Sequence, residues 1–580
     1  MRRTLACVLA LTASSVSLAQ QVQVEEFTLD NGMEFLLVPR TDQPNVIAAG
    51  WLARVGSVNE RPGITGISHF FEHMMFKGTT TIGTEDAETD DELNRQIAAI
   101  GARLREAHLT TQYDRWREGE IDDPWDPAHD TPDMATLRMH LKAAMESQRE
   151  SIVKDEFDQV YTREGGSGMN AFTSEDLTFY FINVPSNKFE LWAWMESDRL
   201  FDSTFREFYS ERDVVHEERR LRTESTPTGK FQEQFNSMFW MASPYNWPVI
   251  GWPTDLNSYT LEQAQDYFNT YYAPNNLVGV IVGDFDAEYI KPVIEAYFGR
   301  LQRGPEAPEV VTLNVEQQAE MRMNAACDCQ PQIEIRYHTV PFAHEDSYAL
   351  QMLSAILNGR TGRLYKNLVE GKEIASSAFA NSDERRYGGA FSFRAETKDD
   401  ATPEQLEEAW DEIVDDLKNN LVSEQELQKV KNQSLANSYR RLQSNFFLLI
   451  QLALYEAQGD WEYINEQPDL LQRVTPRDII QVANKYFTDT NRAVATYERL
   501  PDSAKVDPAL LAIDPQFRQM AKQTVARIDS VNNVDELIQM RTMMDARAGE
   551  TPAQLKPAID YIREKLEARI EALESGSQGG

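Results

Sequence analysis

The stretch His69-Phe70-Phe71-Glu72-His73 decides the local fold and the chemistry that this chain can carry. It reads H-x-x-E-H, the reverse of the H-E-x-x-H pattern of zinc sites. On a helix, positions i and i+4 share a face, so His69 and His73 can hold one metal ion. Glu72 lies on the same side, where it can take a proton from a metal-activated water. The alternative interpretation is an amphipathic helix with two half-buried histidines.

Turn-forming and capping residues flank this motif and predict a short helix. Pro62-Gly63 interrupts the chain before the motif, Thr65 or Ser68 can cap the helix, and Gly78 can end it. A short helix with defined ends can hold a metal site rigidly, which favours the metal interpretation over the amphipathic one.

The length and composition of the chain indicate a large soluble protein. Its 580 residues are enough for two or three domains, and 41% apolar with 26% charged residues is usual for a globular protein. The 57 basic and 93 acidic residues argue against nucleic acid and anionic membrane surfaces as partners. No stretch after the N-terminus reaches about 18 uninterrupted apolar residues, so no transmembrane helix is expected.

The N-terminus has the features of a signal peptide over residues 1–19. Met1-Arg2-Arg3 is basic, the following residues are mostly apolar, and Ser17-Leu18-Ala19 offers a cleavage site of small residues. The alternative is a buried N-terminal strand. A signal peptide predicts export to a periplasmic or secreted location. Because export favours oxidation, Cys327 and Cys329 are expected to form a local disulfide.

The segment 84–160 is expected to be a helical hairpin inserted into the first domain. Apolar residues recur every three or four positions on both sides of an acidic, proline-containing stretch at 114–132. Neither predicted helix is apolar over a wide face, which favours an insertion over a part of the main core. The stretch at 114–132 is expected to be disordered or loosely packed.

An internal repeat predicts two domains that share one plan. Residues 260–282 indicate a capped helix, an aromatic pair, a turn and a strand, and residues 475–497 repeat this order. The predicted fold class is therefore α+β, with two α/β domains. The predicted limits are a signal peptide at 1–19, an N-terminal catalytic domain at 20–305, a linker at 306–330, a non-catalytic C-terminal domain at 331–500, and a helical tail at 501–580.

A catalytic zinc site keeps three protein ligands, so the two histidines need one more. Many acids could supply it, and spacing alone does not choose among them. Three separated motifs, at residues 66–79, 170–174 and 211–218, resemble the pitrilysin/insulinase family of zinc metallopeptidases, in particular its bacterial processing-peptidase-like branch. The resemblance covers roughly residues 25–500. It implies two homologous α/β sandwich domains, one zinc ion per chain, and a substrate that is a peptide or an unfolded polypeptide.

The resemblance also implies roles for individual residues. Glu218 matches the family's third metal ligand, and Glu211 matches an acid that orients a histidine or a water. Glu217 is the competing ligand and is otherwise a surface acid. Asn170 and Ala171 would present their backbone to an extended peptide as an added strand, and the alternative for both is an ordinary strand position.

Two departures from the family pattern bear on function. His73 and Glu218 are farther apart in the chain than in most relatives, which an outward-folded hairpin would explain. Val369 and Ser376 occupy the positions where many relatives place an Arg and a Tyr that face the substrate. We therefore expect a second subunit to complete the substrate chamber, in a homodimer or in a heterodimer with a related chain.

Three functional interpretations remain at the level of sequence. The first is a zinc-dependent endopeptidase in which Glu72, as general base, takes a proton from water and passes it to the leaving amine. The second is a non-catalytic or partner-dependent peptide-binding subunit of a heterodimeric peptidase. The third is an interaction protein that uses its hairpin and tail. Glu72 favours the first interpretation, because a purely structural metal site needs no base.

Overall fold

The computed structural model of the chain describes residues 21–500, 509, 513–531, 533–546 and 555–577. The predicted signal peptide, residues 1–19, lies outside them. The chain divides into a larger unit that extends to Tyr497 and a smaller unit that contains the C-terminal tail and the short segment Ala326–Cys329.

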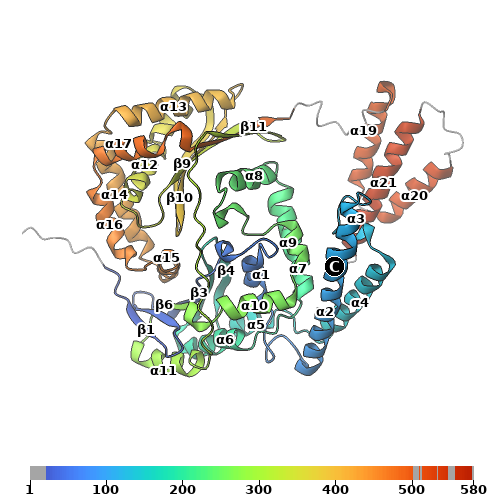
Figure 1. Ribbon diagram of the computed structural model, residues 1–580, viewed down its shortest axis with the longest axis horizontal. Coiled ribbons are helices and arrows are strands. Elements are labelled where there is room, and N and C mark those ends of the chain that lie inside the picture. The colour runs from blue at the N-terminus through green and yellow to red at the C-terminus, as the bar shows by residue number, and fades with distance from the viewer. Residues whose placement is uncertain (1–20, 501–508, 510–512, 532, 547–554, 578–580) are drawn as a thin grey trace, which may run out of the picture. The chain divides into compact units, whose positions relative to one another are not determined.

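A mixed β-sheet forms the centre of the first half of the larger unit (Figure 1). Its strands follow the order β1-β2-β6-β3-β5-β4, with β2 and β6 parallel and the other neighbours antiparallel. They are β1 (Glu25–Thr28), β2 (Glu34–Pro39), β3 (Val46–Ala53), β4 (Ser167–Thr173), β5 (Thr178–Pro185) and β6 (Leu277–Gly283). The two central strands, β3 and β6, are buried on both faces, which explains their nearly continuous apolar sequence.

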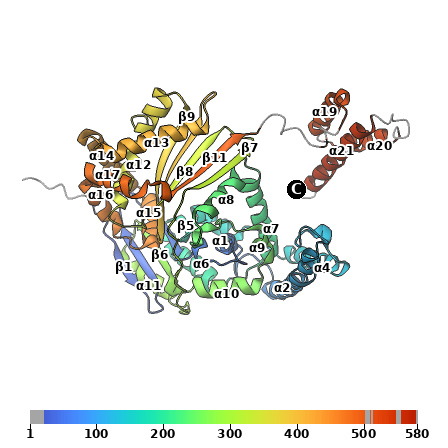
Figure 2. The same ribbon diagram turned by 45° about the horizontal axis from the view of Figure 1, so that its top comes forward.

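Helices of both halves cover this first sheet. Those involved are α1 (Ile67–Met74), α6 (Phe189–Phe201), α10 (Leu261–Tyr271), α11 (Ala287–Phe298) and α15 (Asn445–Gln458). The first four pack on one face, around Trp51. On the other face, Leu52 and Val280 belong to one apolar cluster with Leu449 and Leu452 of α15 (Figure 2). Because α15 comes from the second half, the two halves share a core.

The second half is built on a sheet of its own, in the order β7-β11-β8-β10-β9. Its strands are β7 (Met321–Cys327), β8 (Gln332–Thr339), β9 (Ala375–Arg385), β10 (Gly388–Thr397) and β11 (Arg492–Arg499). Its other helices are α12 (Ser347–Leu357), α13 (Pro403–Asn419), α14 (Glu424–Arg441), α16 (Tyr463–Arg473) and α17 (Pro476–Tyr486). The sheet begins at Met321, inside the stretch predicted as a linker. Cys327 and Cys329 form the expected disulfide at the end of β7.

The internal repeat has the same local hydrogen bonds in both halves. Helices α10 and α17 each begin with a capping box, at Thr260 and Thr475. After each helix an asparagine side chain donates to the carbonyl oxygen of a tyrosine, from Asn276 and from Asn491, both at 2.8 Å. The predicted α+β fold with two related α/β halves is confirmed.

The inserted segment is a helical hairpin. It comprises α2 (Ala87–Ala107), a π-helical turn (His108–Gln112), α3 (Tyr113–Arg117) and α4 (Pro132–Arg149). The prediction of a disordered or loosely packed tip was wrong. The His108 ring stacks on Trp125 with centroids 4.5 Å apart, and its Nδ1 lies 2.8 Å from the Pro124 carbonyl oxygen. Gln112 and Arg115 both donate to the His129 carbonyl oxygen. These contacts join residues far apart along the tip, so helical periodicity does not reveal them.

The tail contains the helices α19 (Pro515–Ser530), α20 (Val534–Ala546) and α21 (Lys556–Ser577). They enclose an apolar core of their own that includes Ile528, Leu537 and Leu566. The helical tail expected from the sequence is therefore present. In the part of the chain that the structure describes, no helix has the length and apolar content that crossing a membrane requires.

Candidate metal centre

Helix α1 carries the H-x-x-E-H motif and begins at a buried carboxylate. Gly66 precedes the helix with a φ of 87°, and a Cβ there would lie 2.5 Å from the Ile250 carbonyl oxygen, so only glycine fits. Glu60 accepts hydrogen bonds of 2.8 Å from the backbone N–H groups of Gly66 and Ser68. Burial raises the pKa of Glu60 to about 8. The predicted caps, Thr65 and Ser68, do not cap the helix with their side chains, because Glu60 accepts from the first N–H groups instead.

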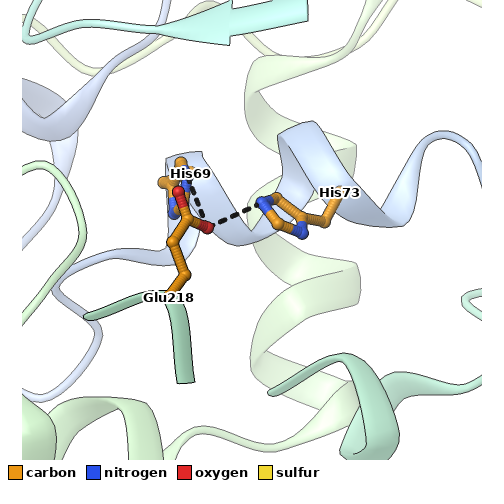
Figure 3. A group of neighbouring side chains, drawn as sticks. All are labelled: His69, His73 and Glu218. Atoms are coloured by element: carbon orange, nitrogen blue, oxygen red, sulfur yellow. Dashed lines mark ion pairs between the residues drawn. The ribbon is translucent and has the colours of Figure 1, made fainter. Parts of the chain in front are cut away.

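Three side chains from two distant helices converge beside α1. His69, His73 and Glu218 each offer one ligand atom, and these atoms all lie within 4.8 Å of one another (Figure 3). Glu218 belongs to α7 (Phe208–Arg219). Its Oε2 lies 3.6 Å from His69 Nε2 and 3.3 Å from His73 Nε2. Among the described residues, this is the one group of His, Cys, Asp and Glu side chains that is arranged to hold a metal ion.

The separations of Glu218 Oε2 from the two imidazoles fit a tetrahedral zinc site. Zinc lies about 2.0–2.1 Å from nitrogen and oxygen ligands, so two ligands of a tetrahedral site are roughly 3.4 Å apart. The distances of 3.3 Å and 3.6 Å from Glu218 Oε2 to the two imidazoles agree with this value. Two imidazoles and one carboxylate are also a donor set of catalytic zinc sites, which leave a fourth position open.

The surroundings shift the pKa values of the two imidazoles in opposite directions. Burial lowers the pKa of His69 to about 3, and the charges of His73 and Arg222 add to this, so the ring is neutral at neutral pH. Burial also opposes protonation of His73, but the hydrogen bond with Glu211 and the charges of Glu211, Glu218 and Glu72 together outweigh burial and raise the pKa. With its Nδ1–H directed to Glu211, His73 turns Nε2 toward Glu218.

Glu211 lies two turns before Glu218 on α7 and is 7% exposed. Its Oε1 is 2.9 Å from His73 Nδ1, and its Oε2 is 2.5 Å from Lys77 Nζ. The lysine and the histidine lower the pKa of Glu211 more than burial raises it, so the carboxylate stays charged. This geometry has the form of the orienting contact that the resemblance implies for Glu211.

The two carboxylate oxygens of Glu218 have different partners. Oε2 faces the histidines, whereas Oε1 lies 2.6 Å from Arg222 in the π-helical turn after α7. The competing acid, Glu217, is 54% exposed and pairs with Arg220. Sequence reasoning missed Arg222, although its position four residues after Glu218 on a helix was a usable signal.

Glu72 lines a cavity that reaches the candidate site at His73. The cavity has a volume of about 630 Å³ and is also lined by His73, Lys77 and the end of the insertion, from Arg149 to Phe157. Glu72 is half-buried. Burial raises its pKa, and the nearby charge of Glu218 adds to this rise. A carboxylate with raised pKa is suited to accept a proton and to return it.

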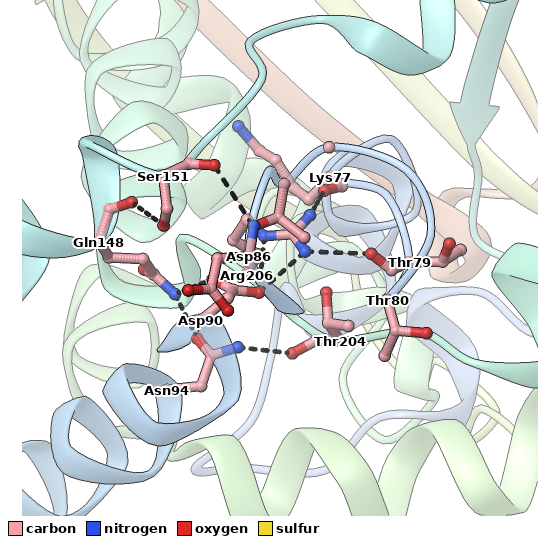
Figure 4. Close-up of polar contacts among 12 residues, drawn as sticks. Lys77, Thr79, Thr80, Asp86, Asp90, Asn94, Gln148, Ser151, Thr204 and Arg206 are labelled. Atoms are coloured by element: carbon pink, nitrogen blue, oxygen red, sulfur yellow. Dashed lines mark hydrogen bonds and ion pairs between the residues drawn. The ribbon is translucent and has the colours of Figure 1, made fainter. Parts of the chain in front are cut away.

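A fully buried arginine joins the root of the insertion to the loop after α1. Arg206 pairs with Asp90 of α2 at 2.8 Å and donates to the carbonyl oxygens of Lys77 and Thr79 (Figure 4). Gln148 of α4 donates to the other oxygen of Asp90. The insertion is therefore bound to the segment from which Lys77 reaches Glu211. No spacing in the sequence indicated this network.

The residues expected to bind substrate lie on the edge strand β4, which is next to α1. Asn170 is exposed and Ala171 is buried. The Ala171 N–H donates to the Asn170 side chain at 2.9 Å. Val369 and Ser376 lie in the second half, Val369 half-buried in a π-helical segment and Ser376 exposed on β9.

Comparison with known proteins identifies relatives of this architecture. Residues 37–115 match the family described as "Insulinase (Peptidase family M16)", and residues 258–434 match "Peptidase M16 inactive domain". The zinc protease PqqE of Helicobacter pylori is 26% identical over 80% of this chain and 90% of its own length. The uncharacterized zinc protease YmxG of Bacillus subtilis is 24% identical over 73% of this chain and 85% of its own length.

Solved structures agree on the fold. A protease from Helicobacter pylori superposes with a TM-score of 0.67 at 24% identity, covering 82% of this chain and all of that one. The periplasmic protease PqqL from Escherichia coli gives a TM-score of 0.61 at 18% identity, over 84% of this chain and 49% of that one. Two segments of the chain match models of the M16 family, and relatives that are named zinc proteases align over most of it, so the chain belongs to the M16 family.

Proposed function

We propose that this protein is a zinc-dependent endopeptidase that hydrolyses peptides or unfolded polypeptides. The observation that carries the proposal is the convergence of His69, His73 and Glu218 beside Glu72, which lines the adjoining cavity. A zinc ion held by the three side chains would supply Lewis acidity toward a peptide carbonyl and a water.

The chain's own residues account for the proton transfers and for the orientation of the site. Glu72 accepts a proton from the attacking water and delivers it to the leaving amine. Glu211 fixes the His73 ring through Nδ1, and Arg222 holds one oxygen of Glu218 so that the other faces the histidines. The edge strand β4, with Asn170 and Ala171, offers backbone groups to an extended peptide.

The test compares wild type with Glu72→Gln in zinc content and in cleavage of quenched fluorescent peptides whose two ends are blocked. We expect the variant to keep its zinc and to lose cleavage, because it loses the base and no proposed ligand. Cleavage of end-blocked peptides by wild type would mark an endopeptidase. Glu92→Gln, at an exposed position of α2, is the control. Unchanged cleavage by Glu72→Gln would refute the role of this residue.

A partner-dependent peptide-binding subunit is the second candidate function. It is favoured by Val369 and Ser376, which stand where the resemblance expects an Arg and a Tyr toward the substrate. In this case the isolated chain would bind peptides and cleave them only when a homodimer or a related subunit completes the chamber. Size-exclusion chromatography with activity assays of each fraction separates the two candidates. We also propose that residues 1–19 direct export to the periplasm or beyond.

A further inference from the structure

A second cavity lies on the face of the second sheet that is turned toward α8 (Gly229–Phe239) of the first half. Its volume is about 410 Å³. Strands β8, β10 and β9 form its floor, and Asn236 of α8 with Trp240, just after that helix, forms its wall. Phe379, 47% exposed, adds an apolar surface at its rim. No role proposed above uses this cavity.

The cavity has an excess of positive charge in a strongly acidic protein. Its lining contains three arginines and two carboxylates, whereas the whole chain has 57 basic and 93 acidic residues. Glu334 is 3% exposed and lies between two of the arginines, 2.5 Å from Arg336 and 2.8 Å from Arg394. One carboxylate therefore balances two guanidinium groups.

The third arginine does not contribute to this excess, because it has acidic partners of its own. Arg385 lies 2.9 Å from Asp383 and 2.8 Å from Glu175. Arg385 is therefore more than balanced, and the positive charge is local to Arg336 and Arg394, which share Glu334.

The two arginines are held in place and still have donors to offer. The Arg336 guanidinium lies 4.7 Å over the Phe235 ring and donates to the Asn236 side chain. Arg394 donates to Glu334 through one Nη, and its side chain is 41% exposed, so part of its guanidinium remains accessible. A planar guanidinium with free N–H groups beside a second one is the usual receptor for a carboxylate.

A neighbouring cavity lies between this one and a residue that contacts the candidate metal centre. This neighbouring cavity has a volume of about 300 Å³, shares Asn236 and Arg336 with the first, and is also lined by Arg222. Arg222 pairs with Oε1 of the proposed ligand Glu218. Two adjoining cavities and the Arg222–Glu218 ion pair thus link the arginine pair on the second sheet to the proposed ligand Glu218, within the larger unit.

We infer that Arg336 and Arg394 anchor a carboxylate of the peptide substrate while another part of the peptide lies at the metal centre. The inference rests on the proposed peptidase function and adds a substrate class, peptides with a carboxylate at or near their C-terminal end. It also assigns substrate contacts to the half of the chain that lacks the expected Arg and Tyr.

The experiment measures binding in a catalytically disabled background, so that it does not depend on turnover. Glu72→Gln protein is titrated against one labelled, unstructured peptide in three forms: a free C-terminal acid, a C-terminal amide, and an amide with Glu as the last residue. We expect the free acid to bind about tenfold more tightly than the plain amide, as a charge-assisted contact of this kind supplies. If the Glu-containing amide binds as tightly as the free acid, a side-chain carboxylate is sufficient for the anchor. If it binds only as tightly as the plain amide, the anchor requires the α-carboxylate.

Adding Arg394→Gln should abolish the difference between acid and amide. Adding Arg322→Gln should preserve it, because Arg322 is equally exposed, at 43%, but lies on β7 at the opposite edge of the same sheet. Equal binding of acid and amide, or no binding of either, would overturn the anchor. A different outcome separates the two proposals. If wild type does not cleave peptides but the Glu72→Gln protein still binds the free acid more tightly, the proposed peptidase is refuted and the anchor is not.

Discussion

Nδ1 of His73 lies 2.9 Å from Oε1 of Glu211, and this pair connects the motif helix α1 to the rest of the protein. The other oxygen of Glu211 lies 2.5 Å from Lys77, which belongs to the loop that surrounds Arg206. Arg206 in turn pairs with Asp90 at the root of the insertion. The orientation of one imidazole thus depends on groups from three parts of the chain, at residues 73–77, 90 and 206–211.

Replacing Glu211 by Gln should weaken zinc binding without abolishing it. The amide can still accept the His73 Nδ1–H, but it lacks the charge that holds both His73 and Lys77. We expect the zinc dissociation constant, measured by competition with a chelator, to rise about 10–100-fold. Glu207→Gln is the matched control, because Glu207 also faces Lys77, at 3.4 Å, and no contact with His73 is described for it. Equal losses in both variants would contradict the role of Glu211.

Glu218→Gln should remove zinc, whereas Glu217→Gln should not. The two acids are neighbours on α7, yet Glu218 faces both histidines and Glu217 pairs with Arg220 on the surface. A neutral amide is a poor zinc ligand compared with a carboxylate. Metal analysis of the two purified variants after dialysis tests this directly. Zinc retained by Glu218→Gln and lost by Glu217→Gln would reverse the ligand assignment.

Asp90→Asn should destabilise the larger unit by about 3–5 kcal/mol, because it leaves the guanidinium of Arg206 buried without its counter-charge. Arg206 is 0% exposed and Asp90 2% exposed in this pair. Chemical denaturation followed by tryptophan fluorescence measures the effect. The adjacent Asp91→Asn is the control, since Asp91 is 66% exposed and should change stability by less than about 0.5 kcal/mol. Equal stability of the Asp90→Asn and Asp91→Asn variants would show that the Asp90–Arg206 pair does not stabilise the attachment of the insertion.

The contribution of Asp176 to the free energy of unfolding should decrease as the pH rises from about 4 to about 6. It lies in the turn between β4 and β5, where it accepts hydrogen bonds from Tyr245 and from the backbone N–H of Arg386 in the second half. Burial raises its pKa from 3.8 to about 6, so the folded state holds this proton more tightly than the unfolded state does. Loss of this proton from the folded state lowers the free energy of unfolding by up to about 3 kcal/mol between about pH 4 and pH 6. At higher pH the decrease stays constant.

The measurement for Asp176 is the melting temperature of wild type minus that of Asp176→Asn, followed from pH 4 to pH 7. The difference should decrease up to about pH 6 and then level off, because the asparagine does not titrate. The comparison with the variant cancels the contributions of the many other acids. A difference that stays constant with pH would show that Asp176 does not carry the raised pKa.

Much of the fold could be predicted because its signals are local. The helix of His69 and His73 depends on a four-residue spacing, and the repeat at 260–282 and 475–497 depends on capping residues and strand patterns within each copy. The buried strands β3 and β6 were recognisable from continuous apolar runs. The tip of the insertion was predicted wrongly, because the stacking of His108 on Trp125 has no periodic signature.

The sequence alone determined that two histidines and a base share one helical face, since side chains four residues apart on a helix must be neighbours. It left the third ligand open among many acids, and only the resemblance pointed to Glu218. Tertiary structure decided which acid reaches the histidines, which arginine holds it, and that Arg336 and Arg394 meet across Glu334 on neighbouring strands. Such contacts arise from the packing of distant segments, whose relative positions no local spacing encodes.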